Sequence, residues 1–207
     1  MILAVDTSLG SAVALIDADG ATRAEAGTTD PLGHAEVIGD LLVDALAAAG
    51  PGDVTHVVAG MGPGPFTGLR IGIAAARAFA LGRSIPVIPV PSHVAAALAV
   101  IEDDGVDGPF AIVTDARRRE VAITVFDGSD SDGIPQITAQ TVLVLAADAD
   151  THLDGIRRID VTSLSGAALA RVGARALSAG RVLTGGEPLY LRSPDVKLPG
   201  APKRVGL

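Results

Sequence analysis

The sequence predicts an α/β protein of two lobes, each a mixed β-sheet flanked by helices, with the second lobe reduced in size. Three observations favour this class. Short apolar runs open the chain and later alternate with amphipathic stretches of helix length. Residues 103–109, rich in aspartate and glycine, have the composition of a linker. A chain of 207 residues can bury a core in each half. We therefore expect an N-terminal lobe over residues 1–104 and a smaller C-terminal lobe with an extended tail over residues 105–207.

The first half opens as a β-meander and continues as alternating strands and helices. Turn sequences at 6–10 and 17–20 separate the first apolar runs. The expected strands are 2–5, 11–16, 21–28, 54–59 and 85–90, and the expected helices are 35–49, 67–81 and 93–101. Apolar residues recur every three or four positions in helix 35–49, and Gly50 ends it. Strands that alternate with helices after an antiparallel opening imply a mixed sheet.

The second half repeats this opening in a shorter form. Its expected strands are 110–114, 121–126 and 136–145, and its expected helix is 165–179. Serine caps are expected for two helices, from Ser92 in the first half and from Ser163 or Ser165 in the second. Gly180 is expected to end the last helix. Residues 146–164 show no clear period.

Charge and composition exclude several classes of function. The chain has 24 acidic and 16 basic residues and a net charge of −8, the opposite of a protein that wraps nucleic acid. Lysine occurs only at Lys197 and Lys203, so the earlier chain has no phosphate-loop or Schiff-base lysine. Without cysteine or closely spaced histidines, no catalytic residue and no metal ligand is assigned. The longest apolar run, 94–101, is too short to span a membrane, which predicts a soluble cytoplasmic protein.

Residues 2–17 and 111–127 share one pattern: an apolar run, an aspartate at the turn, a second apolar run and a closing aspartate. Either two ordinary hairpins look alike, or a lobe is duplicated as in the actin-like ATPase (ASKHA) fold, whose paired turns hold the phosphates and metal of ATP. Asp6, Thr7 and Ser8 supply a carboxylate and hydroxyls suited to such a turn. The second turn, 115–119, has three arginines and no glycine. We therefore expect Asp6, Thr7 and Ser8 to be a vestigial phosphate turn that Asp6 caps.

A glycine-rich loop, 60–65, leads from a strand into helix 67–81. The start of a helix attracts anions, but two prolines remove N–H donors from this loop and weaken it as a phosphate site. In the helix, small residues recur every fourth position at Gly68, Gly72, Ala76 and Ala80. Glycine inside a helix costs about 0.5–1 kcal/mol relative to alanine, so something must approach the backbone closely. The ridge either packs on the chain's own sheet or forms a flat interface with another molecule.

Four segments together resemble the TsaB (YeaZ) family. They are the opening ILAVDTSLGSAVALID, the block GMGPGPFTGLRIGIAAARAFALG, the hairpin IVTDARRREVAITVF and the late PLYLR. The resemblance covers nearly the whole chain and is weakest across residues 127–165. The glycine-rich block is its most specific part.

The resemblance implies an actin-like two-lobed fold and a role in placing threonylcarbamoyl on the adenosine next to the tRNA anticodon. The chain is then a non-catalytic subunit that binds a catalytic paralogue, TsaD, and an ATPase, TsaE, and that forms homodimers when alone. It implies no cofactor in the isolated chain, ATP and magnesium only in the complex, and only an indirect or weak contact with tRNA. The expected partner surface lies on the two helices of the first lobe and comprises Gly39, Leu42, Val43, Leu46, Gly68, Arg70, Gly72, Ala76 and Phe79.

Other interpretations stay open at this point. The chain could be an autonomous actin-like ATP-dependent kinase or carbamoyl transferase, which predicts tight binding of Mg-ATP. Arg117, Arg118 and Arg119 either contact tRNA or an acidic partner, or form an ordinary solvated turn. The basic tail, 197–204, raises the same question. Gly185-Gly186 is expected to be a turn, followed by a strand-like segment at 189–191.

Overall fold

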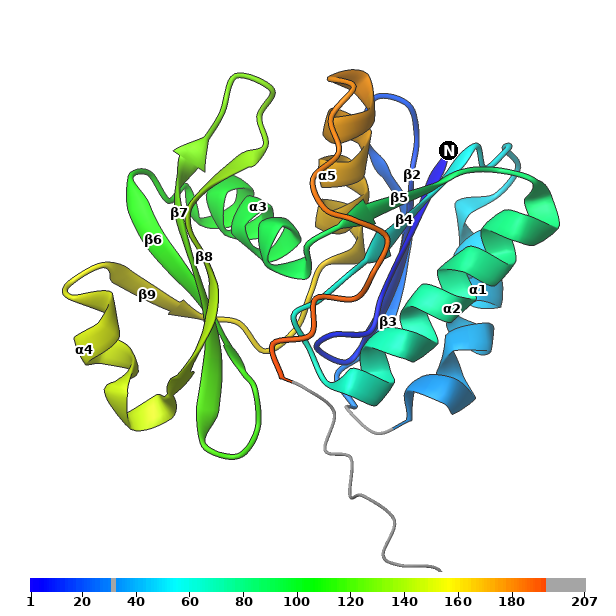
Figure 1. The fold of residues 1–207 in the computed structure, drawn as a ribbon. Coiled ribbons are helices and arrows are strands. Elements are labelled where there is room, and N and C mark those ends of the chain that lie inside the picture. Colours follow the sequence, from blue (N-terminus) through cyan, green and yellow to red (C-terminus); the bar gives the residue numbers. More distant parts are fainter. Residues whose placement is uncertain (31–32, 193–207) are drawn as a thin grey trace, which may run out of the picture.

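The structure, a computed structural model, describes residues 1–30 and 33–192. It consists of two sheets with helices on their faces (Figure 1). The first half contains β1 (Ile2–Asp6), β2 (Ser11–Ile16), β3 (Thr22–Thr28), α1 (His34–Ala49), β4 (His56–Gly60), α2 (Phe66–Arg83), β5 (Val87–Val90) and α3 (Ser92–Asp104). The second half contains β6 (Pro109–Asp115), β7 (Glu120–Ser129), β8 (Pro135–Leu145), η1 (Ala146–Asp148), α4 (Ala149–Leu153), β9 (Arg157–Asp160) and α5 (Gly166–Ser178).

The two sheets repeat one topology, which favours a duplicated lobe over a chance likeness of two hairpins. Among the described residues, the first sheet has the order β3-β2-β1-β4-β5 and the second has the order β8-β7-β6-β9. In each sheet the first strand of the repeat pairs antiparallel with the next strand and parallel with a later one. Asp6 and Asp115 are the last residues of β1 and β6, so the two aspartates occupy equivalent positions. Within the described residues the second sheet has no counterpart of β5, which agrees with a reduced second lobe.

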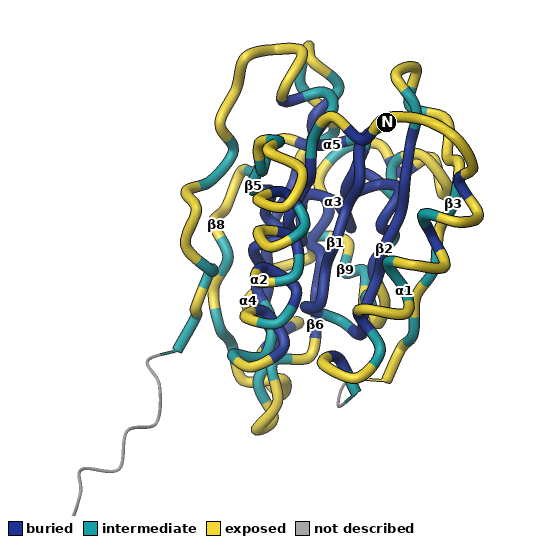
Figure 2. Tube along the Cα trace, turned by 90° about the vertical axis from the view of Figure 1, so that its right-hand side faces the viewer, coloured by how far each residue is buried: buried dark blue, intermediate teal, exposed yellow. Residues whose placement is uncertain are grey.

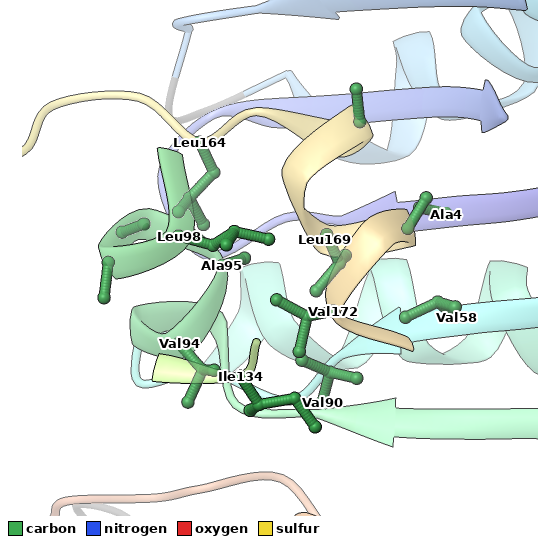
Figure 3. Packing of buried hydrophobic residues seen from close by; sticks show 14 of the residues in the cluster. Ala4, Val58, Val90, Val94, Ala95, Leu98, Ile134, Leu164, Leu169 and Val172 are labelled. Carbon is green, nitrogen blue, oxygen red and sulfur yellow. The ribbon is translucent and has the colours of Figure 1, made fainter. Parts of the chain in front are cut away.

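Each face of the first sheet has its own core, because successive side chains of a strand point to opposite faces. Leu3 and Val5 of β1 pack toward α1 and α2, whereas Ala4 packs toward α5. Figure 2 shows β1 and β2 buried at the centre, with exposed residues along the outer sides of the helices. Figure 3 shows the second core, where Leu169 of α5 lies between the first sheet and α3.

Helix α5 crosses back onto the first sheet, although the sequence analysis assigned residues 105–207 to the second lobe. Glycine makes this packing close: a Cβ on Gly166 would lie 3.0 Å from the Cβ of Ala14, and one on Gly173 would overlap Val58. The expected boundary at 104/105 therefore separates the sheets but not the helices. Packing between elements this far apart in the chain cannot be predicted from the local sequence pattern.

Several smaller expectations have clear outcomes. Ser165 caps α5 by accepting a hydrogen bond from Ala168 N, and Gly180 follows the helix in a left-handed conformation, as predicted. Residues 189–191 are not a strand. The unassigned segment 146–164 contains η1, α4 and β9. The basic tail at 197–204 lies outside the described residues. No helix in the described part of the chain is long and apolar enough to cross a lipid bilayer.

Candidate functional site

The turn that follows β1 centres on the buried carboxylate of Asp6, which is 2% exposed. Its Oδ1 accepts hydrogen bonds from Ser8 N at 2.6 Å and from Ser8 Oγ at 2.5 Å. Its Oδ2 accepts one from Ser92 Oγ at 2.5 Å. Burial raises the pKa of Asp6 above its ordinary value, and the hydrogen bonds from Ser8 and Ser92 oppose that shift. Asp6 therefore caps its own turn, as expected, with both oxygens engaged inside the protein.

The glycine-rich loop closes over this turn. A Cβ on Gly60 would overlap Asp6 Oδ2, and a Cβ on Gly64 would lie 2.7 Å from the Cβ of Ser8. Glycine is needed at both positions because the backbone of the loop touches the turn directly. The backbone of the loop therefore lies directly against the Asp6 carboxylate and Ser8.

The Thr7 side chain is likewise engaged inside the protein, where it binds the first turns of α2. Its hydroxyl donates to Gly68 O at 2.6 Å and accepts from Gly72 N at 3.0 Å. Thr7 and Ser8 are both nearly fully buried. Asp6, Thr7 and Ser8 were expected to be a vestigial phosphate turn that Asp6 caps. Their polar groups are engaged within the protein, because the loop and α2 pack directly onto them.

Ser92 is a residue whose role the sequence analysis missed. We expected it to cap α3, but α3 has no side-chain cap. Its hydroxyl instead donates to Asp6 and accepts from Gly62 N at 3.0 Å. A serine just before an apolar helix predicts a cap, and no local signal points to a partner 86 residues away.

The next residue, His93, contacts the other sheet. Its two ring nitrogens hydrogen-bond with Thr124 Oγ1 at 2.6 Å and with Thr114 Oγ1 at 2.9 Å. Burial lowers the pKa of His93 to about 3, so the ring is neutral at physiological pH. Ser92 and His93 thus attach the first turn of α3 to β1 on one side and to β6 and β7 on the other.

The turn that follows β6 has the same cap but a different outer surface. Asp115 Oδ1 accepts from Arg117 N at 3.0 Å, which matches the bond from Ser8 N to Asp6. Arg117, Arg118 and Arg119 follow with φ angles of 63°, 56° and 63°, all in the left-handed region. All three are exposed. The two equivalent turns therefore differ in that one is buried and the other projects into solvent.

A segment that we call the C-terminal strap, residues 185–192, runs between the two halves (Figure 1). Its Leu189 N donates to Met61 O at 2.8 Å. The ring of Tyr190 lies 4.6 Å from that of Phe66, and its hydroxyl accepts from Arg70 Nε at 2.9 Å.

At its far end, the strap's Arg192 pairs with Glu120 and donates to Arg117 O at 3.3 Å. The strap, the loop 63–66 and the turn 114–118 line a pocket of about 450 Å³, together with Ala122 and Leu143. That volume lies within the usual range for a small-molecule site.

The expected partner surface divides into two parts. Gly68, Gly72 and Ala76 are buried, and a Cβ on Gly72 would overlap the hydroxyl of Thr7. The small-residue ridge therefore packs on the chain's own turn, and the expectation that these three residues face a partner is corrected. Arg70 is also engaged within the chain, with its guanidinium 3.8 Å from the centre of the Phe66 ring.

The other expected partner residues are exposed or only partly buried. Val43 is 66% exposed, and nothing lies within 4 Å of a Cβ on Gly39. Leu42, Leu46 and Phe79 are partly buried against the first core. Leu81 on α2, which the sequence analysis did not select, is 82% exposed.

The comparisons with known proteins decide the family. A family model described as TsaD, tRNA N6-adenosine threonylcarbamoyltransferase, matches residues 32–161, which is more than half of the chain. The chain belongs to this family.

Within the TsaD family, the chain is TsaB/YeaZ-like. It is 34% identical over 122 residues to an Escherichia coli (strain K12) protein named tRNA threonylcarbamoyladenosine biosynthesis protein TsaB, covering 58% of this chain and 52% of that protein. It is 41% identical over 124 residues to an uncharacterized protein of Mycobacterium tuberculosis (strain CDC 1551 / Oshkosh), covering 58% of this chain and 56% of that protein. The chain thus spans about half the length of the curated relatives it matches.

The fold of this TsaD-family chain is also that of a solved structure. YeaZ from Pseudomonas aeruginosa superposes with a TM-score of 0.74, at 23% identity, over 92% of this chain and 99% of that one. This likeness shows that the two chains share the fold of two mixed sheets flanked by helices. Within residues 1–30 and 33–192, no three histidine, aspartate or glutamate side chains come together as a metal site.

Proposed function

We propose that this chain is the TsaB-type partner subunit of the complex that transfers threonylcarbamoyl to the adenosine next to the tRNA anticodon. In this role it binds the catalytic paralogue TsaD, works with the ATPase TsaE, and catalyses no step itself. Its compartment is then the cytoplasm, where tRNA is modified. Family membership and the names of the TsaB relatives support this role.

One observation carries the non-catalytic part of the proposal. In an actin-like clamp, the carboxylate after the first strand must reach the metal or its waters. Here Asp6 is 2% exposed, both of its oxygens accept hydrogen bonds from serines, and the loop at Gly60 lies against it. Opening this turn would break three hydrogen bonds to a buried carboxylate, at roughly 1.5–3 kcal/mol each.

The outer side of α1 and α2 is the proposed partner surface. Two of the chain's exposed large apolar residues, Val43 on α1 and Leu81 on α2, belong to these helices, as do Gly39, Leu42, Leu46 and Phe79. An interface core of this kind is apolar and close-packed. The same surface serves a second copy of the chain when TsaD is absent.

Reconstitution tests the proposal. The purified chain is mixed with its cognate TsaD and TsaE, and threonylcarbamoyl transfer to a tRNA transcript is measured in the presence of ATP, threonine and bicarbonate. We expect transfer only when all three proteins are present. We also expect Val43→Asp to reduce the complex mass measured by light scattering, whereas Asp103→Asn, an exposed change at the end of α3, leaves it unchanged.

Calorimetry of the isolated chain separates this proposal from an autonomous kinase or carbamoyl transferase. We expect no heat of Mg-ATP binding. Tight nucleotide binding that Asp6→Ala abolishes would establish the enzyme instead.

A further inference from the structure

A run of consecutive arginines lies in the arginine turn, which we define as residues 116–120 between β6 and β7. Arg117, Arg118 and Arg119 are exposed there in succession. Each has a left-handed backbone conformation, with φ between 56° and 63°. Glycine or asparagine adopts this conformation at lower cost.

The carboxylates near the arginine turn are already used. Glu120 pairs with Arg192 of the strap, and Asp115 accepts from the backbone of Arg117. Within residues 1–30 and 33–192, the guanidinium groups of Arg117 and Arg119 have no ion-pair partner. Arg192 also donates to Arg117 O, which fixes the turn against the strap. Within the described part of the chain, Arg117 and Arg119 thus stand as exposed cations without an ion pair, on a chain whose net charge is −8.

The net negative charge of the chain does not cancel this local field. Charges separated by more than about 8 Å in solvent are largely screened at physiological ionic strength. A ligand at the arginine turn therefore experiences the arginines and Arg192 rather than the acidic residues elsewhere. Arginine binds phosphate through paired N–H groups, which makes it the preferred residue for nucleic-acid backbones.

We propose that the arginine turn is a docking site for the phosphate backbone of RNA. This inference rests on the proposed function, because that function supplies the RNA: the tRNA that the complex modifies. Successive phosphates present an unbroken row of negative charge to the arginines. A protein surface, in contrast, mixes acidic with basic groups. Arg117 and Arg119 each contact a phosphate, and the contact positions the tRNA without reading its sequence.

Salt dependence of tRNA binding tests this assignment. The chain is assembled with its cognate TsaD, and the binding constant for an unmodified tRNA transcript is measured by fluorescence anisotropy across a series of KCl concentrations. Each lost phosphate contact lowers the slope of log K against log salt by about 0.7–0.9. We expect Arg117→Gln/Arg119→Gln to lower the magnitude of the slope by about 1.4–1.8, twice that contribution.

Two controls make the result specific. Arg157→Gln removes one positive charge from an exposed residue on β9 of the same lobe, and we expect its slope to equal that of the wild type, whereas Arg119→Gln alone lowers the slope. Arg117→Lys/Arg119→Lys keeps the charges and restores most of the slope. A thermal melt of each variant checks that the fold is intact.

The outcomes separate this inference from the proposed function. If the wild-type complex forms and modifies tRNA but Arg117→Gln/Arg119→Gln behaves like Arg157→Gln, the docking site is wrong and the function stands. If Arg117→Gln/Arg119→Gln instead loses TsaD from the complex, the arginine turn binds an acidic protein surface and the RNA assignment is overturned. If the wild-type chain does not assemble with TsaD at all, the proposed function itself fails.

Discussion

Gly72→Ala tests whether the small-residue ridge of α2 packs inside the chain. On a solvent-facing helix surface, replacing glycine by alanine stabilises the fold by up to about 1 kcal/mol. Here the new methyl group would overlap Thr7 Oγ1 and lie 3.0 Å from Thr7 Cγ2. It would displace the hydroxyl that bridges Gly68 O and Gly72 N. The variant is therefore expected to lose stability, the opposite sign.

The magnitude follows from these contacts. Two hydrogen bonds contribute about 1 kcal/mol each, and a buried hydroxyl left without partners costs about 1–3 kcal/mol. The gain in helix propensity offsets about 1 kcal/mol of that loss. We therefore expect Gly72→Ala to lower the free energy of unfolding by about 2–4 kcal/mol. For a chain of this length, that corresponds to a decrease in Tm of about 4–16 °C.

Urea denaturation followed by circular dichroism measures this change, with Gly39→Ala as the matched control. Nothing lies within 4 Å of a Cβ on Gly39, so that variant is expected to gain about 0.5–1 kcal/mol. In a Thr7→Ala background, Gly72→Ala should cost less, because the overlapping hydroxyl is gone. Equal stabilisation by Gly72→Ala and Gly39→Ala would show that the ridge does not pack against Thr7.

Three further predictions follow from the buried polar groups and the strap. Burial raises the folded-state pKa of Asp6 above 3.8, so the contribution of Asp6 to stability is present below pH 3.8 and is lost as the pH rises through the folded-state pKa. Urea titrations of the wild type from pH 4 to 7 should therefore show stability falling as the pH rises, and Asp6→Asn should show a smaller fall. The pH dependence that His93 contributes has the opposite sign, because its folded-state pKa is about 3 and the ordinary value is 6.5. Wild-type stability should therefore fall by about 1.4 kcal/mol for each pH unit below 6.5. The His93→Gln variant should lack this component. A His93→Gln variant that keeps the full slope would contradict a neutral buried ring. Tyr190→Ala should speed amide exchange at Leu189, whose N–H bonds Met61 O, while Val182→Ala, an exposed change outside the strap, should not.

The internal repeat could be recognised in the sequence because it appears as a local pattern of apolar runs and turn residues. The apolar runs and turn aspartates of residues 2–17 and 111–127 reflect strand period and turn chemistry, and both hairpins formed where they were expected. The cap at Ser165 was recoverable for the same reason. Signals of this type depend on neighbours within a few positions.

The site was only partly predictable. The residues of the Asp6 turn were identified from the sequence. That loop 60–65 packs directly on them could not be predicted, because it depends on how closely Gly60 approaches Asp6 and Gly64 approaches Ser8. Ser92 was misassigned as a cap because the same residue type serves both roles. The ridge at Gly68 and Gly72 was recognised, and both of its explanations were consistent with the sequence.

The sequence by itself determined the fold class, the duplication of the hairpin and the residues available for chemistry, because composition and periodicity are local properties. Tertiary structure alone decided that α5 returns to the first sheet, that Ser92 and His93 join the two sheets, and that the strap brings Arg192 to the arginine turn. These contacts join residues far apart in the chain. Their stability comes from shape fit and burial between whole elements, which no short stretch of sequence specifies.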